Sequence, residues 1–121
     1  MSYTHKFTGL LTAVPTPLNA DGTVREEALS RLIKVQVDAG ADGIVPMGGT
    51  GEFTALTPSA RATAVETTIA AANGIPVVPG VISPGFGEAV ETGKTFQKLG
   101  AKGLMVIAPF YVKPTQEGIR D

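Results

Sequence analysis

The stretch "DAGADGIVPMG" (Asp38–Gly48) occurs a second time, in altered form, as "KLGAKGLMVIA" (Lys98–Ala108). In both copies a Gly-Ala pair is followed by one residue, a further glycine and an apolar run, and the copies lie 60 residues apart. This distance corresponds to two strand–helix units of about 30 residues each. Equal units favour a (β/α) barrel over a doubly wound sheet, in which the strand order reverses partway.

Four short apolar runs along the chain predict strands. They are mostly aliphatic or β-branched, they are bounded by Gly or Pro, and none alternates cleanly between apolar and polar residues. Such runs are typical of strands covered on both faces, as in a parallel sheet. The runs are "GLLTAVPTP" (Gly9–Pro17), "DGIVPMG" (Asp42–Gly48), "IPVVPGVI" (Ile75–Ile82) and "KGLMVIAPF" (Lys102–Phe110).

Three helical patterns separate these runs. We expect Asp21 or Thr23 to cap the first helix and Thr57 to cap the second, which has Pro58 at its first position. The second helix is expected to turn Ala62, Val65, Ile69 and Ala72 inward. The helices are predicted to begin near Glu26, at Pro58 and near Gly87, and to stop at Gly40, Asn73-Gly74 and Gly100; "PTQEGIRD" (114–121) resembles the start of a fourth helix.

The resulting order, βαβαβαβ, predicts parallel strands joined by helical crossovers. A complete (β/α)8 TIM barrel needs about 250 residues, and four strands with three helices make half of one. We therefore expect residues 1–121 to be the N-terminal part of a single barrel domain. The alternative is a small open four-stranded α/β domain that is complete at residue 121.

Composition limits the classes of function. Hydrophobic residues make up 43% of the 121 residues, charged residues 17%, and the net charge is −1. Nucleic acids and anionic membranes, which require clustered Lys and Arg, are not expected as partners. Without cysteine there is no thiolate nucleophile or disulfide, and no His and carboxylate cluster has metal-ligand spacing, so neither a metal nor another cofactor is expected. The polar N-terminus and the lack of a membrane-spanning run predict a cytoplasmic protein.

The loop "GGTGE" (Gly48–Glu52) follows the second predicted strand and is the first candidate site. Its glycines allow the backbone to approach a ligand and to turn N–H groups toward a small carboxylate, with the Thr50 hydroxyl as a further donor. It is not a P-loop, because no Lys-Ser/Thr follows, and it lacks the G-x-G-x-x-G spacing of dinucleotide sites. From spacing alone, a glycine turn between strand and helix is an equal alternative.

Tyr111, in "APFYVKP" after the fourth strand, is the second candidate. Its phenol can relay protons if a partner hydroxyl is within reach, or it can simply pack against a neighbour. No lysine lies within an apolar strand, where desolvation would lower its pKa and make it a Schiff-base nucleophile. His5, the single histidine, is expected to be solvated in the polar terminus.

Several stretches together resemble the dihydrodipicolinate synthase / N-acetylneuraminate lyase family of class I aldolase-type (β/α)8 enzymes. They occur in the family's order along nearly the whole chain and match only the N-terminal part of a family member. The stretches are "GLLTAVPTPL", "VDAGADGI", "GGTGEFTALT" and "APFYVKPTQEG".

The resemblance implies a lyase that forms a Schiff base between pyruvate, or another 2-keto acid, and a lysine beyond residue 121. Residues 1–121 alone are then expected to be inactive. It further implies that Gly48, Gly49 and Thr50 bind the substrate carboxylate through backbone amides and the Thr50 hydroxyl. Tyr111 matches a tyrosine that reaches across a tight dimer interface into a proton relay, so a homo-oligomer, a dimer or a tetramer, is expected.

One residue departs from the family pattern. Gly49 stands where synthases of the family carry a hydroxyl residue, so a side-chain relay from this position to Tyr111 is impossible, whereas the backbone N–H remains. The loop also resembles that of 5-dehydro-4-deoxyglucarate dehydratases, which use the same chemistry on a sugar acid. The alternatives to a synthase are therefore such a dehydratase or a non-catalytic half-barrel fragment.

Overall fold

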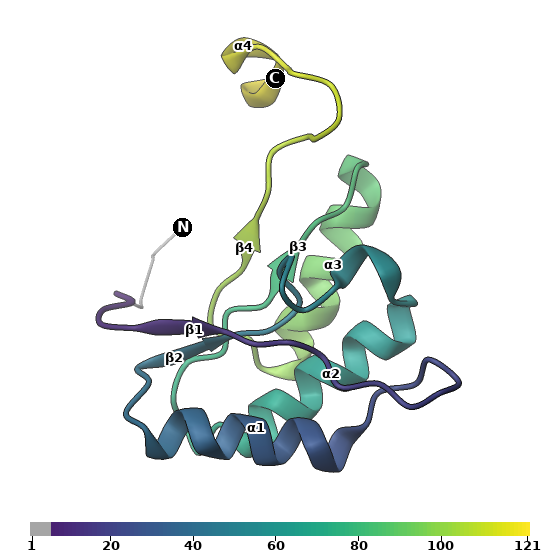
Figure 1. Ribbon diagram of the computed structural model, residues 1–121. Coiled ribbons are helices and arrows are strands. Elements are labelled where there is room, and N and C mark those ends of the chain that lie inside the picture. Colours follow the sequence, from purple (N-terminus) through teal and green to yellow (C-terminus); the bar gives the residue numbers. More distant parts are fainter. Residues whose placement is uncertain (1–5) are drawn as a thin grey trace.

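The computed structural model describes residues 6–121, so the predicted environment of His5 lies outside the described part (Figure 1). Strands and helices alternate along the chain, as the apolar runs predict. No helix in residues 6–121 has the length and apolar character needed to cross a membrane. The elements are β1 (Leu11–Ala13), α1 (Glu26–Asp38), β2 (Gly43–Val45), the 3-10 turn η1 (Phe53–Ala55), α2 (Pro58–Ala71), β3 (Gly80–Val81), α3 (Phe86–Leu99), β4 (Met105–Val106) and α4 (Gln116–Arg120).

The four strands lie side by side in chain order, and all are parallel. β1 pairs with β2, and β3 pairs with β4. A parallel bridge between Ile44 and Val77 joins the two pairs, and the Gly80 N–H donates to the Pro46 carbonyl at 2.8 Å. An order without reversal is that of a barrel, whereas a doubly wound sheet changes direction at a switch point. The chain forms the first half of a (β/α)8 barrel, and the predicted fold class is confirmed.

The strands are shorter than the apolar runs that predict them. Proline explains much of the difference, because it has no N–H to donate to a neighbouring strand. β2 stops at Val45 before Pro46, and β3 begins only after Pro79. The Val78 N–H, just before Pro79, still donates to the Ile44 carbonyl of β2 at 2.9 Å. The pairing with β2 therefore begins before the first residue of β3.

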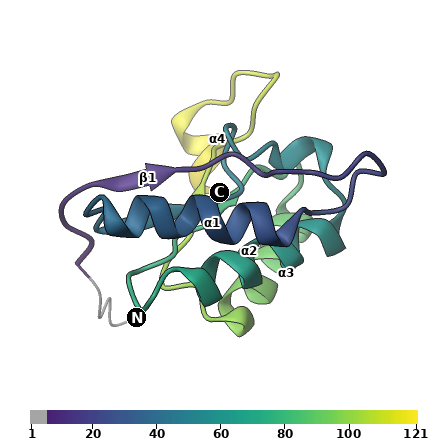
Figure 2. The ribbon, with the colours of Figure 1, turned by 60° about the horizontal axis from the view of Figure 1, so that its bottom comes forward.

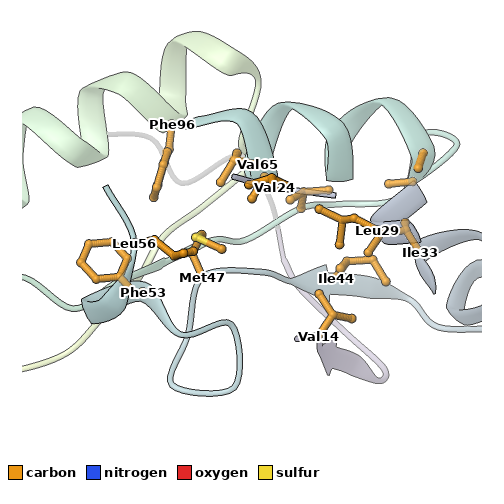
Figure 3. Close-up of a cluster of buried hydrophobic side chains, with 14 of the residues drawn as sticks. Val14, Val24, Leu29, Ile33, Ile44, Met47, Phe53, Leu56, Val65 and Phe96 are labelled. Atoms are coloured by element: carbon orange, nitrogen blue, oxygen red, sulfur yellow. The ribbon is translucent and has the colours of Figure 1, made fainter. Parts of the chain in front are cut away.

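The helices and the sheet enclose one hydrophobic core (Figure 3). Ile44 and Met47, from β2 and the loop after it, are fully buried, as is Ile33 of α1. Burial of each such side chain contributes about 1.5–3 kcal/mol. The predicted burial on both faces holds for β2, whereas Met105 and Val106 of β4 are 46% and 62% exposed, because no strand within residues 6–121 lies beyond β4.

Helix α2 lies between α1 and α3 and packs against both (Figure 2). Because it has a neighbour on each side, α2 buries more of its surface than the single face that the sequence predicts. Val65 and Ala72 are buried as predicted, and Ile69 packs against the core, but Ala62 is outside the core and the buried surface extends to other positions. The residues of α2 that are buried are Arg61, Ala64, Val65, Thr67, Thr68 and Ala71.

The predicted cap of the first helix is wrong. Helix α1 begins after Arg25, and no side chain caps it. The Asp21 carboxylate instead accepts hydrogen bonds from the N–H and hydroxyl of Thr23, at 3.0 and 2.6 Å, within the preceding turn. These bonds, the hydroxyl bond foremost, hold the pKa of Asp21 below its usual value. Asp and Ser/Thr side chains satisfy a turn in the same way as a helix end, so the two roles look alike in sequence.

The other predicted helix ends are confirmed. Thr57 accepts a hydrogen bond from the Ala60 N–H at 3.2 Å, and Pro58 is the first residue of α2. The stops at Gly40, Gly74 and Gly100 have φ of +92°, +89° and +109°, a backbone conformation that favours glycine. The start of a fourth helix is confirmed as α4.

We predict that Thr57→Ala lowers the free energy of unfolding by about 1 kcal/mol, because it removes the cap of a helix that packs on two neighbours. Urea denaturation followed by circular dichroism measures this change. Thr115→Ala is the matched control. Thr115 caps the short exposed helix α4 through the Gly118 N–H at 3.1 Å, so its loss should leave global unfolding nearly unchanged. Equal losses in both variants would contradict this account.

Candidate functional site

The loop from Pro46 to Glu52 lies where the carboxyl ends of the strands meet. Parallel strands bring these ends to the same edge, which is where (β/α) barrels bind ligands. Each neighbouring strand approaches the loop. The Thr16 hydroxyl, after β1, donates to the Gly51 carbonyl at 2.7 Å. Gly80 of β3 lies so close that a Cβ there would be 2.5 Å from the Met47 carbonyl oxygen, and Met105 of β4 lies against Gly48.

Two residues with left-handed backbone conformation bracket the loop. Met47 has φ of 60° and Glu52 has φ of 59°, values that are uncommon for residues other than glycine. Gly51 permits the turn between them, because a Cβ there would be 2.5 Å from the Met47 backbone nitrogen. The loop therefore folds back closely on the backbone of Met47.

The middle of the loop offers hydrogen-bond donors to solvent. Gly48 and Gly51 are buried, whereas Gly49 and Thr50 are exposed. The carbonyls of Gly48 and Gly49 accept bonds from the N–H groups of Phe53 and Glu52, at 3.4 and 3.1 Å. Within residues 6–121, the amides of Gly49 and Thr50 and the Thr50 hydroxyl have no protein acceptor. Three donors side by side suit a small carboxylate.

Tyr111 has an unusual backbone and an entirely exposed side chain. Its φ is 76° and its relative exposure is 103%. A bulky residue in this conformation is an outlier of the kind that occurs at functional sites. The described residues contain no hydrogen bond between Tyr111 and the loop, so the structure does not bring these two candidates into contact within one chain.

No lysine of the described residues is placed to act as a nucleophile. All six lysines are exposed, from Lys6 to Lys113. In residues 6–121 there is also no group of three or more His, Cys, Asp or Glu residues that could hold a metal ion.

Two buried polar residues at the loop carried no predicted role. Thr16 was expected only as part of a strand end, and Arg61 was not expected at the site at all. The Arg61 Nε donates to the Phe53 carbonyl at 2.9 Å, and its guanidinium lies 3.8 Å from the centroid of the Phe53 ring. A signal was present in the sequence, since Arg61 falls on the same face of α2 as Ala64, Val65 and Thr68.

The (β/α)8 barrel is shared by many enzymes of different function, so the fold alone does not identify the family. Comparison with known proteins does. The model of the Dihydrodipicolinate synthetase family matches residues 6–121. The chain belongs to this family.

Individual relatives agree with this assignment. The chain is 42% identical over 117 residues to the 4-hydroxy-tetrahydrodipicolinate synthase of Gluconacetobacter diazotrophicus. This alignment covers 96% of the chain and 39% of that relative. Dihydrodipicolinate synthase from Aquifex aeolicus superimposes with a TM-score of 0.86 at 38% identity, over 93% of this chain and 39% of that one. The chloride-inhibited dihydrodipicolinate synthase of Acinetobacter baumannii, complexed with pyruvate, superimposes with a TM-score of 0.88 at 33% identity, over 94% and 40%. The chain thus spans about two fifths of the length of these relatives.

We predict that Gly51→Ala destabilises the protein by about 1–3 kcal/mol, because the new methyl group must displace the Met47 backbone. Gly49→Ala is the matched control. A Cβ at Gly49 meets nothing within 4 Å, and its backbone is outside the left-handed region. Its effect should stay within about 0.5 kcal/mol. Thermal unfolding of both variants checks the difference, which would be absent if the loop were free to move.

Proposed function

We propose that the full-length protein is a lyase that forms a Schiff base between a lysine beyond residue 121 and a 2-keto acid, pyruvate or a larger relative. The observation that carries this proposal is the group of three unpartnered donors on Gly49 and Thr50 at the barrel's catalytic edge. The names of the relatives support the reaction class, and the pyruvate complex of the Acinetobacter baumannii enzyme supports the substrate.

The loop holds the carboxylate of the 2-keto acid. The amides of Gly49 and Thr50 and the Thr50 hydroxyl donate to its oxygens, and hydrogen bonds to a charged group are about twice as strong as neutral ones. Gly48 lies buried beneath this group, where a side chain would meet Met105. With the carboxylate fixed, the adjacent carbonyl has one orientation toward the attacking amine, which lowers the entropic part of the barrier.

The covalent step follows from general chemistry. The lysine amine attacks the keto carbon, and loss of water gives an iminium ion. The positive nitrogen withdraws electrons through the former keto carbon, so the next carbon of the substrate can release a proton. The C–H electron pair forms a C=C bond, the C=N pair moves to nitrogen, and the resulting enamine is nucleophilic at that next carbon. The loop's role is to keep the carboxylate in place through these changes in the keto carbon.

Tyr111 is assigned to proton transfer in the assembled enzyme. Its exposed side chain and its outlying φ, in the segment that follows β4, suit a residue that acts on a neighbouring subunit of a homo-oligomer. Among residues 6–121, no hydrogen bond links Tyr111 to the loop that it would serve.

Gly49 favours a second candidate, a lyase of the 5-dehydro-4-deoxyglucarate dehydratase kind. A side chain at this position would project into open space, so its absence leaves room at the loop for a substrate larger than pyruvate. Both candidates use the same loop and the same Schiff base. Turnover of the sugar acid, with pyruvate bound but not converted, would select the dehydratase.

Borohydride reduction tests the mechanism. We predict that reducing the full-length protein in the presence of pyruvate adds one reduced pyruvyl group to a single lysine, located by peptide mass spectrometry beyond residue 121. Reduction without the keto acid is the control. Absence of an adduct with pyruvate and with larger 2-keto acids would exclude a Schiff-base enzyme and would favour a non-catalytic protein.

Thr50→Val tests the carboxylate site. The change keeps the shape of the side chain and removes one hydrogen bond to a charged group, so the pyruvate concentration for half-maximal trapping should rise about tenfold or more. Thr54→Val is the matched control, because Thr54 is exposed on η1 four residues further along the chain. Equal behaviour of the two variants would argue against a role for the Thr50 hydroxyl.

A further inference from the structure

Two buried side chains hold the backbone carbonyls of Gly51 and Phe53, the residues before and after Glu52. The Thr16 hydroxyl donates to the Gly51 carbonyl at 2.7 Å, and the Arg61 Nε donates to the Phe53 carbonyl at 2.9 Å. Thr16 is 6% exposed and Arg61 is 8% exposed. Thr16 comes from the segment just after β1 and Arg61 from near the start of α2, so the loop is anchored to two separate parts of the barrel.

The Thr16 contact continues through the backbone to a donor of the loop. A peptide group is planar, so fixing the Gly51 carbonyl also fixes the N–H of Glu52 on its opposite side. That N–H donates to the Gly49 carbonyl at 3.1 Å. The Gly49 carbonyl in turn shares a peptide plane with the Thr50 N–H. Two planes therefore connect the Thr16 hydroxyl to the amide of Thr50.

Arg61 acts on the second donor through the whole residue Phe53, because the carbonyl and the N–H of Phe53 belong to different peptide groups. It holds the Phe53 carbonyl and also covers the Phe53 ring, which is 1% exposed. The Phe53 N–H donates to the Gly48 carbonyl at 3.4 Å. This carbonyl shares a peptide plane with the Gly49 N–H, so the position of Phe53 sets the direction of that amide.

The guanidinium of Arg61 is itself fixed by a charge partner. The Arg61 Nη1 lies 2.9 Å from a carboxylate oxygen of Glu88, in the first turn of α3. The Glu88 side chain is 47% exposed, so the ion pair adds little to stability, but it compensates a charge that is otherwise buried. Arg61 thereby has one orientation, with Nε directed at the loop.

We propose that Thr16 and Arg61 are positioning residues that aim the amides of Thr50 and Gly49 at the substrate carboxylate. The inference rests on the proposed function, in which these amides bind a 2-keto acid. Neither residue touches the substrate. Thr16 acts through the peptide group of Gly51 and Glu52, and Arg61 acts through the buried residue Phe53, which it holds by the carbonyl and the ring.

Thr16→Val in the full-length protein is the first test, with Thr68→Val as its matched control. Thr68 is also buried, and its hydroxyl donates to the Ala64 carbonyl, likewise at 2.7 Å, but inside α2. Both variants should lose similar thermal stability. Only Thr16→Val should raise the pyruvate concentration for half-maximal borohydride trapping, by about tenfold, the equivalent of one net hydrogen bond. Thr16→Ser, which keeps the hydroxyl, should restore it.

Arg61→Lys and Glu88→Gln form a second pair. Arg61→Lys keeps the positive charge near Glu88 but removes the Nε donor, so trapping should again require a higher pyruvate concentration. Glu88→Gln removes the charge but keeps a side-chain oxygen that can accept from the Arg61 Nη1, so Nε stays directed at Phe53 and pyruvate should bind as in the unaltered protein. The positioning role is overturned if Thr16→Val and Arg61→Lys bind pyruvate with unaltered affinity, or if Thr68→Val weakens binding as much as Thr16→Val.

A separate measurement distinguishes failure of this inference from failure of the proposed function. If the unaltered protein forms no adduct with any 2-keto acid, the proposed function is wrong, and amide chemical shifts of isotope-labelled Gly49 and Thr50 then decide the positioning role. Thr16→Val should move the Thr50 signal, and Thr68→Val should leave it in place. Unmoved loop signals in Thr16→Val would overturn the positioning role independently of any ligand.

Discussion

The arrangement of the loop and of β3 at the strand ends depends on close packing against the backbone of Met47. Met47 is fully buried in a left-handed conformation, and Gly51 and Gly80 both pack directly against it, each where a Cβ would come within 2.5 Å. This contact brings β3 beside β2 and turns the loop back on itself. A side chain on either glycine would separate these segments, so close backbone packing, rather than any single hydrogen bond, sets the geometry of the site.

The same loop joins the core to the surface. Phe53 and Leu56, just after the loop, lie near Met47 in the core (Figure 3), while Gly49 and Thr50 face solvent. Buried polar groups must find hydrogen-bond partners, and here those partners orient the loop's peptide groups. Under the proposed function, these hydrogen bonds would fix the direction of the exposed amides before a ligand arrives, which is the preorganisation that anion binding requires.

Short sequence patterns predicted correctly those features that depend only on neighbouring residues, such as the start of α2 and the ends of the helices. The Thr57-Pro58 start of α2 and the glycine stops of the helices follow from backbone chemistry alone. The cap assigned to Asp21 or Thr23 was wrong because an Asp can satisfy a turn or a helix with the same hydrogen bonds. The face of α2 was only partly predicted, because its burial depends on helices on both sides. The location of the GGTGE loop followed from the parallel strand order.

By itself, the sequence determined the alternation of strands and helices and the position of the loop, because periodicity and turn residues act over short distances. The 60-residue repeat indicated the barrel class, and the resemblance of several stretches to known enzymes indicated the family. Only the tertiary structure decided which amides of the loop face solvent, that Tyr111 is exposed in an outlying conformation, and that Thr16 and Arg61 hold the loop. Thr16 lies 35 residues from Gly51, and Arg61 lies 27 residues from Glu88. Contacts over such separations form only when packing brings the elements together, and no local pattern records them.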